Sequence, residues 1–129
     1  MIVETSALIS ILREEPDAQK FLDAIGSAEL KRISAANYLE AAIVIDAERN
    51  PISSRRLDEF LSRAEIEILP LTEVQAKIAR QAYRDFGKGS GHPAKLNFGD
   101  CLAYALAIDT GEGLLFQGSE FTHTGVKIA

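Results

Sequence analysis

Three carboxylates stand alone in otherwise uncharged, largely apolar stretches of this 129-residue chain. They are Glu4 within residues 1–12, Glu40 within residues 33–45 and Asp100 within residues 96–108. Burying a carboxylate costs several kcal/mol unless a cation compensates for it, and none of these stretches contains a lysine or an arginine. Carboxylates that converge without a cation repel one another and raise each other's pKa. Because a divalent ion removes this conflict and oxygen ligands favour hard metals, the pattern predicts a site for Mg²⁺ or Mn²⁺.

The predicted elements indicate that the acidic residues meet at one edge of a sheet. Glu4 follows a strand at 2–3, and Asp100 lies in the first turn of a helix at 98–110. A fourth carboxylate, Glu120, follows a strand at 114–116. Ligands of open α/β sheets bind outside the carboxyl ends of the strands. Glu40 would reach this place from within a helix. Taken singly, each residue has an ordinary explanation, such as a favourable charge at a helix N-terminus for Asp100.

The rest of the chain predicts an α/β domain in which strands alternate with helices around a mainly parallel sheet. Strands are expected at 2–3, 30–33, 66–69 and 114–116, with a short edge strand at 126–128. In the first half of the chain, helices are expected from a cap at Thr5 or Ser6 to Leu12, from the turn at Pro16 to Gly26, and over 35–48. In the second half, they are expected around 57–61, from a capping box at Thr72 and Gln75 to Gly87, and over 98–110 behind a cap at Asn97.

Composition is that of an ordinary soluble globular protein, with 47% hydrophobic and 26% charged residues. The length predicts a single domain over residues 1–129. No apolar run approaches the roughly 18–20 residues that cross a bilayer, and no signal peptide is evident, so we expect a cytoplasmic protein with no membrane partner. The single Cys101 is better explained as a packed apolar residue than as a nucleophile.

Four motifs in order along the chain resemble those of PIN-domain nucleases, specifically the VapC-type toxins of bacterial toxin–antitoxin pairs. The motifs are Val-Glu-Thr-Ser-Ala-Leu at 3–8, Tyr-Leu-Glu at 38–40, Leu-Asn-Phe-Gly-Asp-Cys at 96–101, and Leu-Leu-Phe-Gln-Gly at 114–118 followed by Glu120-Phe121 and Thr124-Gly125. The resemblance implies a PIN-like three-layer α/β/α sandwich and an endoribonuclease that depends on Mg²⁺ or Mn²⁺ and cleaves tRNA or rRNA. It also implies a homodimer and a VapB-like antitoxin that blocks the site.

The resemblance also assigns roles to residues of this sequence. It implies that Glu4, Glu40 and Asp100 are catalytic metal ligands, that Glu120 is an outer ligand, and that Ser6, Asn97 and Ser119 support them. For Ser6 and Asn97, helix capping is an equally good explanation.

A cluster of cations falls between residues 77 and 95 of a chain whose net charge is −5. Arg80, Arg84, Lys88 and Lys95 are candidates to bind RNA phosphates, with a solvated helix face as the alternative. Tyr83 and Phe86 are predicted to be core residues and not surfaces for base stacking.

Two positions depart from the family pattern. Glu4 stands where aspartate is usual, and either Ser119 or Glu120 fills the fourth acidic position. The added methylene moves the carboxylate by about an ångström, and a misplacement of that size can cost roughly a hundredfold in rate. Two functions therefore stay open at this point. One is an active ribonuclease, and the other is a catalytically weak or inactive dimerising module that binds a VapB-like antitoxin.

Overall fold

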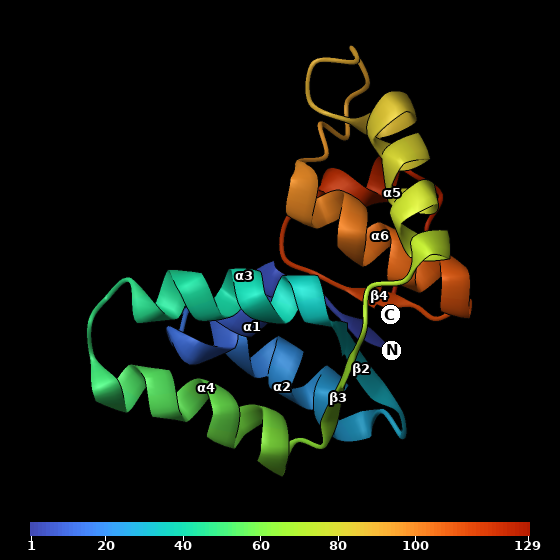
Figure 1. The fold of residues 1–129 in the computed structure, drawn as a ribbon. Coiled ribbons are helices and arrows are strands. Elements are labelled where there is room, and N and C mark those ends of the chain that lie inside the picture. The colour runs from blue at the N-terminus through green and yellow to red at the C-terminus, as the bar shows by residue number, and fades with distance from the viewer.

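A parallel four-stranded sheet lies at the centre of the computed structural model, which describes all residues 1–129 (Figure 1). The strands are β1 (Ile2–Val3), β2 (Lys31–Ser34), β3 (Ile66–Leu69) and β4 (Leu114–Leu115). Their order in the sheet is β3-β2-β1-β4, and every neighbouring pair is parallel. The carboxyl ends of all strands therefore lie along one edge of the sheet.

Helices cover both faces of this sheet. They are α1 (Thr5–Leu12), α2 (Ala18–Ser27), α3 (Ala35–Asp46), α4 (Pro51–Arg63), α5 (Glu73–Phe86) and α6 (Phe98–Thr110), followed by the short 3₁₀ helix η1 (Glu120–His123). Because side chains alternate along a strand, Ile2 and Leu114 pack with α5 and α6, whereas Val3 and Leu115 pack with α1, α2 and α4. Figure 1 shows these two helical layers on either side of the strands, which confirms the predicted α/β/α sandwich. None of the helices is long and apolar enough to cross a membrane.

Capping residues explain where several helices begin. Asn97 Oδ1 accepts a hydrogen bond from the Asp100 amide, and Asp100 Oδ2 accepts one from the Asn97 amide, both at 2.9 Å. This reciprocal pair satisfies two amides that the helix itself leaves unbonded. Asn50 caps α4 ahead of Pro51, and Gly111 ends α6 in the left-handed conformation at φ 72°. The helix expected around 57–61 begins earlier, because Asn50 and Pro51 start α4 at residue 51. The bounds of β1, β2, β3, α3, α5 and α6 lie within two residues of their predicted positions.

The two helices that follow β1 begin differently from the prediction. Glu4, and not Thr5 or Ser6, caps α1, because its carboxylate accepts the Ser6 amide at 2.7 Å. An acidic N-cap is favourable because it pairs with unbonded amides and with the positive end of the helix dipole. The next helix, α2, begins two residues after Pro16 and includes Gly26, which was predicted to end it.

The C-terminal strands are shorter than predicted. β4 ends at Leu115 instead of continuing to 116, and the expected edge strand at 126–128 is reduced to one bridge between Ile128 and Leu114. The Leu114 amide donates to the Lys127 carbonyl at 2.8 Å, so the end of the chain is tied to the sheet edge without forming a regular ladder.

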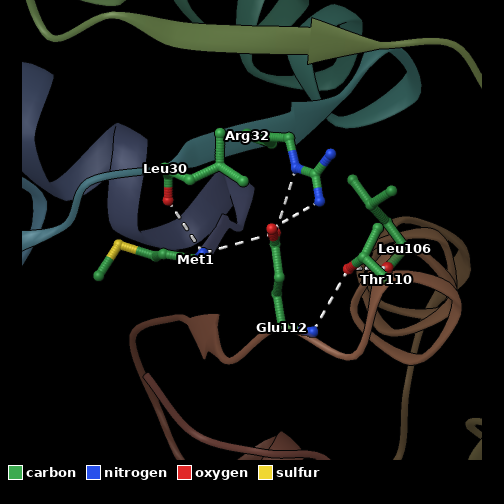
Figure 2. Close-up of polar contacts among 6 residues, drawn as sticks. All are labelled: Met1, Leu30, Arg32, Leu106, Thr110 and Glu112. Atoms are coloured by element: carbon green, nitrogen blue, oxygen red, sulfur yellow. Dashed lines mark hydrogen bonds and ion pairs between the residues drawn. The ribbon is translucent and has the colours of Figure 1, made fainter.

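A charged cluster of Met1, Arg32 and Glu112 lies at the amino ends of the strands, because Met1 precedes β1, Arg32 is near the start of β2 and Glu112 precedes β4. Figure 2 shows its contacts. The Arg32 guanidinium donates to both carboxylate oxygens of Glu112, at 2.5 and 3.3 Å. The ammonium group of Met1 lies 3.4 Å from the same carboxylate and donates to the Leu30 carbonyl at 3.0 Å. Burial works to raise the pKa of Glu112, but the hydrogen bond from Arg32 and the nearby positive charges outweigh it and hold this pKa below its usual value.

Candidate active site

Five carboxylates line a cleft of about 400 Å³ at the carboxyl ends of the strands. They belong to Glu4, Glu15, Glu40, Asp100 and Glu120. The topology explains the meeting, because Glu4 directly follows β1, Asp100 occupies the first turn of α6, and Glu120 begins η1 beyond β4. Glu40 reaches the cleft from α3, as its apolar surroundings indicated. The structure therefore brings together all four acidic residues that the sequence singled out.

Glu4 is the most deeply buried of these carboxylates, with 4% of the residue exposed. Its Oε2 atom accepts hydrogen bonds from the Ser6 amide, at 2.7 Å, and from the Ser6 hydroxyl. Burial raises the pKa of Glu4 from 4.5 to about 7, against the lowering effect of the Ser6 hydrogen bonds, and the negative charges of Asp100 and Glu40 raise it further. At neutral pH this carboxyl group is therefore poised between its protonated and ionised forms.

The Glu40 carboxylate rests against the first turn of α6. Its Oε1 atom accepts a hydrogen bond from the Thr5 hydroxyl at 2.5 Å and a longer one from Asn37 Nδ2 at 3.4 Å. A Cβ atom at Gly99 would lie 2.6 Å from the Glu40 Cδ atom, closer than non-bonded carbon atoms come. Only glycine at position 99 lets this carboxylate lie where it does, beside Asp100.

Asp100 is half-buried and combines a structural contact with an open one. Its Oδ2 atom accepts the Asn97 amide in the capping box, and its Oδ1 atom has no protein donor. Burial raises the pKa of Asp100, and the charges of Glu120 and Glu40 act in the same direction. The pKa values of Glu4 and Asp100 are raised mainly by the same cause, which is burial away from water, and the neighbouring negative charges add to it.

No cation neutralises this gathered charge. The ion pairs of the protein join Arg32 and the N-terminus to Glu112, Arg13 to Glu48, Arg56 to Glu14, and Lys77 to Glu73. The donors in the cleft are oxygen atoms, which suit Mg²⁺ or Mn²⁺. As the side chains stand, no three acidic, histidine or cysteine residues come close enough to share one ion. The chemistry of the cleft thus fits a hard divalent cation, although its side chains do not form a complete coordination shell.

The supporting residues fall into two groups. Ser6 and Asn97 line the cleft, and their amides donate to Glu4 and Asp100. Asn97 caps α6 as expected, whereas capping does not explain Ser6, because Glu4 caps α1. Ser119 is exposed and does not line the cleft, whereas its neighbour Glu120 does. Several cleft residues were missed, among them Glu15 and Thr5. Glu15 was hidden among other charged residues of its turn, and Thr5, whose hydroxyl contacts Glu40, was considered only as a cap.

The predicted RNA-binding cations are all exposed, and none of them takes part in an ion pair. Arg80 and Lys88 line a second hollow of about 650 Å³ between α5 and α6, which shares Asn97 with the acidic cleft. Arg84 and Lys95 line neither hollow.

The second hollow is mainly apolar and corrects one prediction. Tyr83, predicted to be a core residue, is 51% exposed at its wall, and Phe98 beside it is 79% exposed. Phe86 is half-buried and packs edge-on against Tyr104, in keeping with a core role. Burial raises the pKa of the Cys101 thiol to about 11, so this residue is a poor nucleophile.

A family model described as "PIN domain" matches residues 1–127. The chain belongs to the PIN-domain family. Within that family it is of the VapC type, because it is 59% identical over 129 residues to Ribonuclease VapC28 of Mycobacterium tuberculosis, with 100% of this chain and 97% of the relative covered.

Solved structures with little sequence identity have the same fold. A toxin–antitoxin complex from Klebsiella pneumoniae contains a chain that matches with a TM-score of 0.76 at 16% identity, covering 99% of this chain and 95% of the other. VapBC2 from Rickettsia felis, bound to a DNA fragment from its promoter, matches with a TM-score of 0.78 at 18% identity, covering 98% and 94%. These likenesses establish the fold alone.

Proposed function

We propose that this VapC-type protein is a toxin that hydrolyses RNA phosphodiester bonds and requires Mg²⁺ or Mn²⁺ in its carboxylate cleft. The observation that carries the proposal is the convergence of Glu4, Glu40, Asp100 and Glu120 without any cationic partner. The name of the 59%-identical relative, a ribonuclease, supports RNA as the substrate, for which tRNA and rRNA are the candidate classes.

Glu4, Glu40 and Asp100 would hold the ion, since each keeps one carboxylate oxygen that accepts no protein hydrogen bond. Glu120, exposed at the start of η1, would serve as an outer ligand in preference to Ser119. When bound, such an ion acidifies a water molecule and stabilises negative charge on the phosphoryl oxygens.

The chain's own residues orient these ligands. The Ser6 amide and hydroxyl fix one oxygen of Glu4, and the Asn97 amide fixes one oxygen of Asp100. Hydrogen bonds of this kind set the direction of the free oxygen and limit how far the carboxylate moves. The two residues therefore support the carboxylates, and Asn97 also caps α6.

Arg80 and Lys88 are the cations best placed to bind RNA phosphates beside the cleft, because the hollow that they line shares Asn97 with it. Arg84 lies one helical turn after Arg80 in α5, and both Arg84 and Lys95 are exposed, so the two would extend this contact. A local basic surface compensates for the net charge of −5, which would otherwise repel RNA.

We further propose two protein partners for a toxin that acts in the cytoplasm. A VapB-like antitoxin would cover the acidic cleft, and the toxin–antitoxin neighbour from Klebsiella pneumoniae supports a partner of this kind. A second copy of the chain would cover the apolar side of α3, where Leu39 and Ile43 expose 57% and 60% of their surface. Apolar side chains gathered in this way mark interaction surfaces.

The proposal is tested by incubating the purified, antitoxin-free chain with a panel of tRNA and rRNA substrates in Mg²⁺, in Mn²⁺ and in EDTA. We expect cuts that require the metal and disappear in Asp100→Asn. Cleavage that survives in the double variant Glu40→Gln/Asp100→Asn would place the reaction elsewhere.

One alternative function has an observation in its favour. Glu4 Oε2 accepts both hydrogen bonds of Ser6, and no three acidic side chains lie close enough to share an ion. Both features are expected of a catalytically weak or inactive module that binds an antitoxin. In that case the wild-type chain cleaves no RNA, and shortening the side chain in Glu4→Asp creates activity. An active wild-type chain that loses activity in Glu4→Asp favours the ribonuclease.

A further inference from the structure

Asn37 is a fully buried polar residue that the assigned functions do not use. It lies in the first turn of α3, three residues before Glu40, and no part of it is exposed. Its Nδ2 atom donates a hydrogen bond to the Gly99 carbonyl of α6 at 3.0 Å and a second, longer one to Glu40 Oε1 at 3.4 Å. One amide group thus joins the helix that carries Glu40 to the helix turn that carries Asp100.

The other half of this amide is left without a partner. Asn37 Oδ1 is buried and accepts no hydrogen bond. An unpaired buried acceptor costs stability, and an apolar side chain of the same size would avoid that cost. The amide is therefore not explained by its contribution to folding alone, whereas its two donated bonds both point at the candidate active site.

The surrounding contacts show what these donated bonds can do. Glu40 Oε1 receives Asn37 from one side and the Thr5 hydroxyl, at 2.5 Å, from another. Asn37 donates to the carbonyl of Gly99, and Gly99 is also the residue that leaves room for the Glu40 carboxylate because it has no Cβ. Asn37 thereby fixes both the carboxylate and the helix turn against which it lies.

We infer that Asn37 is a positioning residue, which sets the place of the Glu40 carboxylate relative to Asp100 and leaves Glu40 Oε2 free to bind a divalent cation. The inference rests on the proposed function, because the ion and the RNA cleavage are proposed there. Asn37 itself touches neither the ion nor the RNA and acts through Glu40.

The variant Asn37→Leu tests this role. Leucine has a similar volume, cannot donate a hydrogen bond, and removes the unpaired carbonyl, so the free energy of unfolding in urea should stay close to that of the wild type. We expect Mn²⁺ affinity, measured by titration calorimetry, to fall about ten- to a hundredfold, as is usual when a partner of a metal ligand is removed. The kcat for RNA cleavage should fall in parallel while KM stays unchanged.

Two comparisons separate positioning from a general structural effect. In a Glu40→Gln background, Asn37→Leu should cause no further loss of Mn²⁺ affinity, because the residue through which it acts is already altered. Ser10→Ala is the matched control, since Ser10 is also fully buried with an unpaired oxygen but lies outside the cleft. It should leave both Mn²⁺ affinity and kcat unchanged.

The inference is overturned if Asn37→Leu binds Mn²⁺ and cleaves RNA like the wild type, or if its effect adds fully to that of Glu40→Gln. If leucine prevents folding, Asn37→Ala, which removes the same donors without added bulk, is measured in the same way. A wild-type chain that neither binds Mn²⁺ nor cleaves RNA refutes the proposed function, and this role of Asn37 with it. A wild-type chain that does both, beside an unaffected Asn37→Leu, refutes only the role of Asn37.

Discussion

The pH dependence of stability should change when Glu4 is replaced by glutamine in the metal-free protein. Burial raises the pKa of Glu4 from 4.5 to about 7 in the folded chain, whereas the unfolded chain releases the proton near 4.5. Between these pH values the folded protein binds a proton that the unfolded chain has lost. The free energy of unfolding therefore falls as the pH rises from about 4.5 to about 7, and it stays low above that range.

The size of this effect follows from the shift. One pKa unit corresponds to about 1.4 kcal/mol, so a shift from 4.5 to about 7 lowers the stability by about 3 kcal/mol at high pH. Solvent screening reduces this value little, because only 4% of Glu4 is exposed. The loss is a large part of the roughly 5–15 kcal/mol that stabilises an ordinary domain.

The assay is urea unfolding in EDTA, followed by circular dichroism at pH 5 and at pH 8. Glutamine has the same shape as Glu4 and still accepts the Ser6 amide, but it does not titrate. The wild type should lose about 2.5 kcal/mol between the two pH values, because part of the total is already lost at pH 5, and Glu4→Gln should lose much less. Glu120→Gln, in the same cleft but exposed, is the control and should behave like the wild type. Equal losses in the wild type and in Glu4→Gln would refute the burial argument.

Three further perturbations probe other parts of the structure. Gly99→Ala should fold but lose cleavage activity on the order of a hundredfold, since the new Cβ overlaps the neighbouring carboxylate of α3; activity like that of the wild type would contradict this packing. Glu112→Gln should lower the free energy of unfolding at pH 7 by about 1–3 kcal/mol, because the ion pair with Arg32 is lost. Folding lowers the pKa of Glu112, so the difference between the two proteins should shrink as the pH falls below about 4.5. The double variant Arg80→Ala/Lys88→Ala should weaken RNA binding and reduce its salt dependence by about 0.7 per lost phosphate contact; a filter-binding assay with an unchanged salt slope would exclude that contact.

Much of the fold could be predicted because local signals and the hydrophobic pattern agree. Asn97 is the expected cap of α6, and strand 66–69 and helix 98–110 have their predicted bounds. The solitary carboxylates also identified the cleft, because a charge inside an apolar stretch is costly unless it has a purpose. Their meeting at one edge follows from the parallel order of the strands.

What could not be predicted depends on contacts between distant parts of the chain. Glu15 gave no signal because its neighbours are charged, and only the turn after α1 brings it to the cleft. The strand expected at 126–128 has the right residue types but pairs with β4 at a single position. Tyr83 belongs to the apolar stripe of its helix, which predicts a buried side chain, yet the hollow between α5 and α6 leaves it exposed. Such outcomes are set by tertiary packing, which overrides local pattern.

The central claim is that the carboxylate cleft binds a divalent cation, and Mn²⁺ binding at pH 7.5 tests it most directly. Free Mn²⁺ is measured by electron paramagnetic resonance while the ion is titrated into the wild-type chain and into Glu40→Gln/Asp100→Asn. The account predicts saturable binding by the wild type and a large loss of affinity in the double variant. No saturable binding by the wild type, or equal affinity in the two proteins, would contradict it.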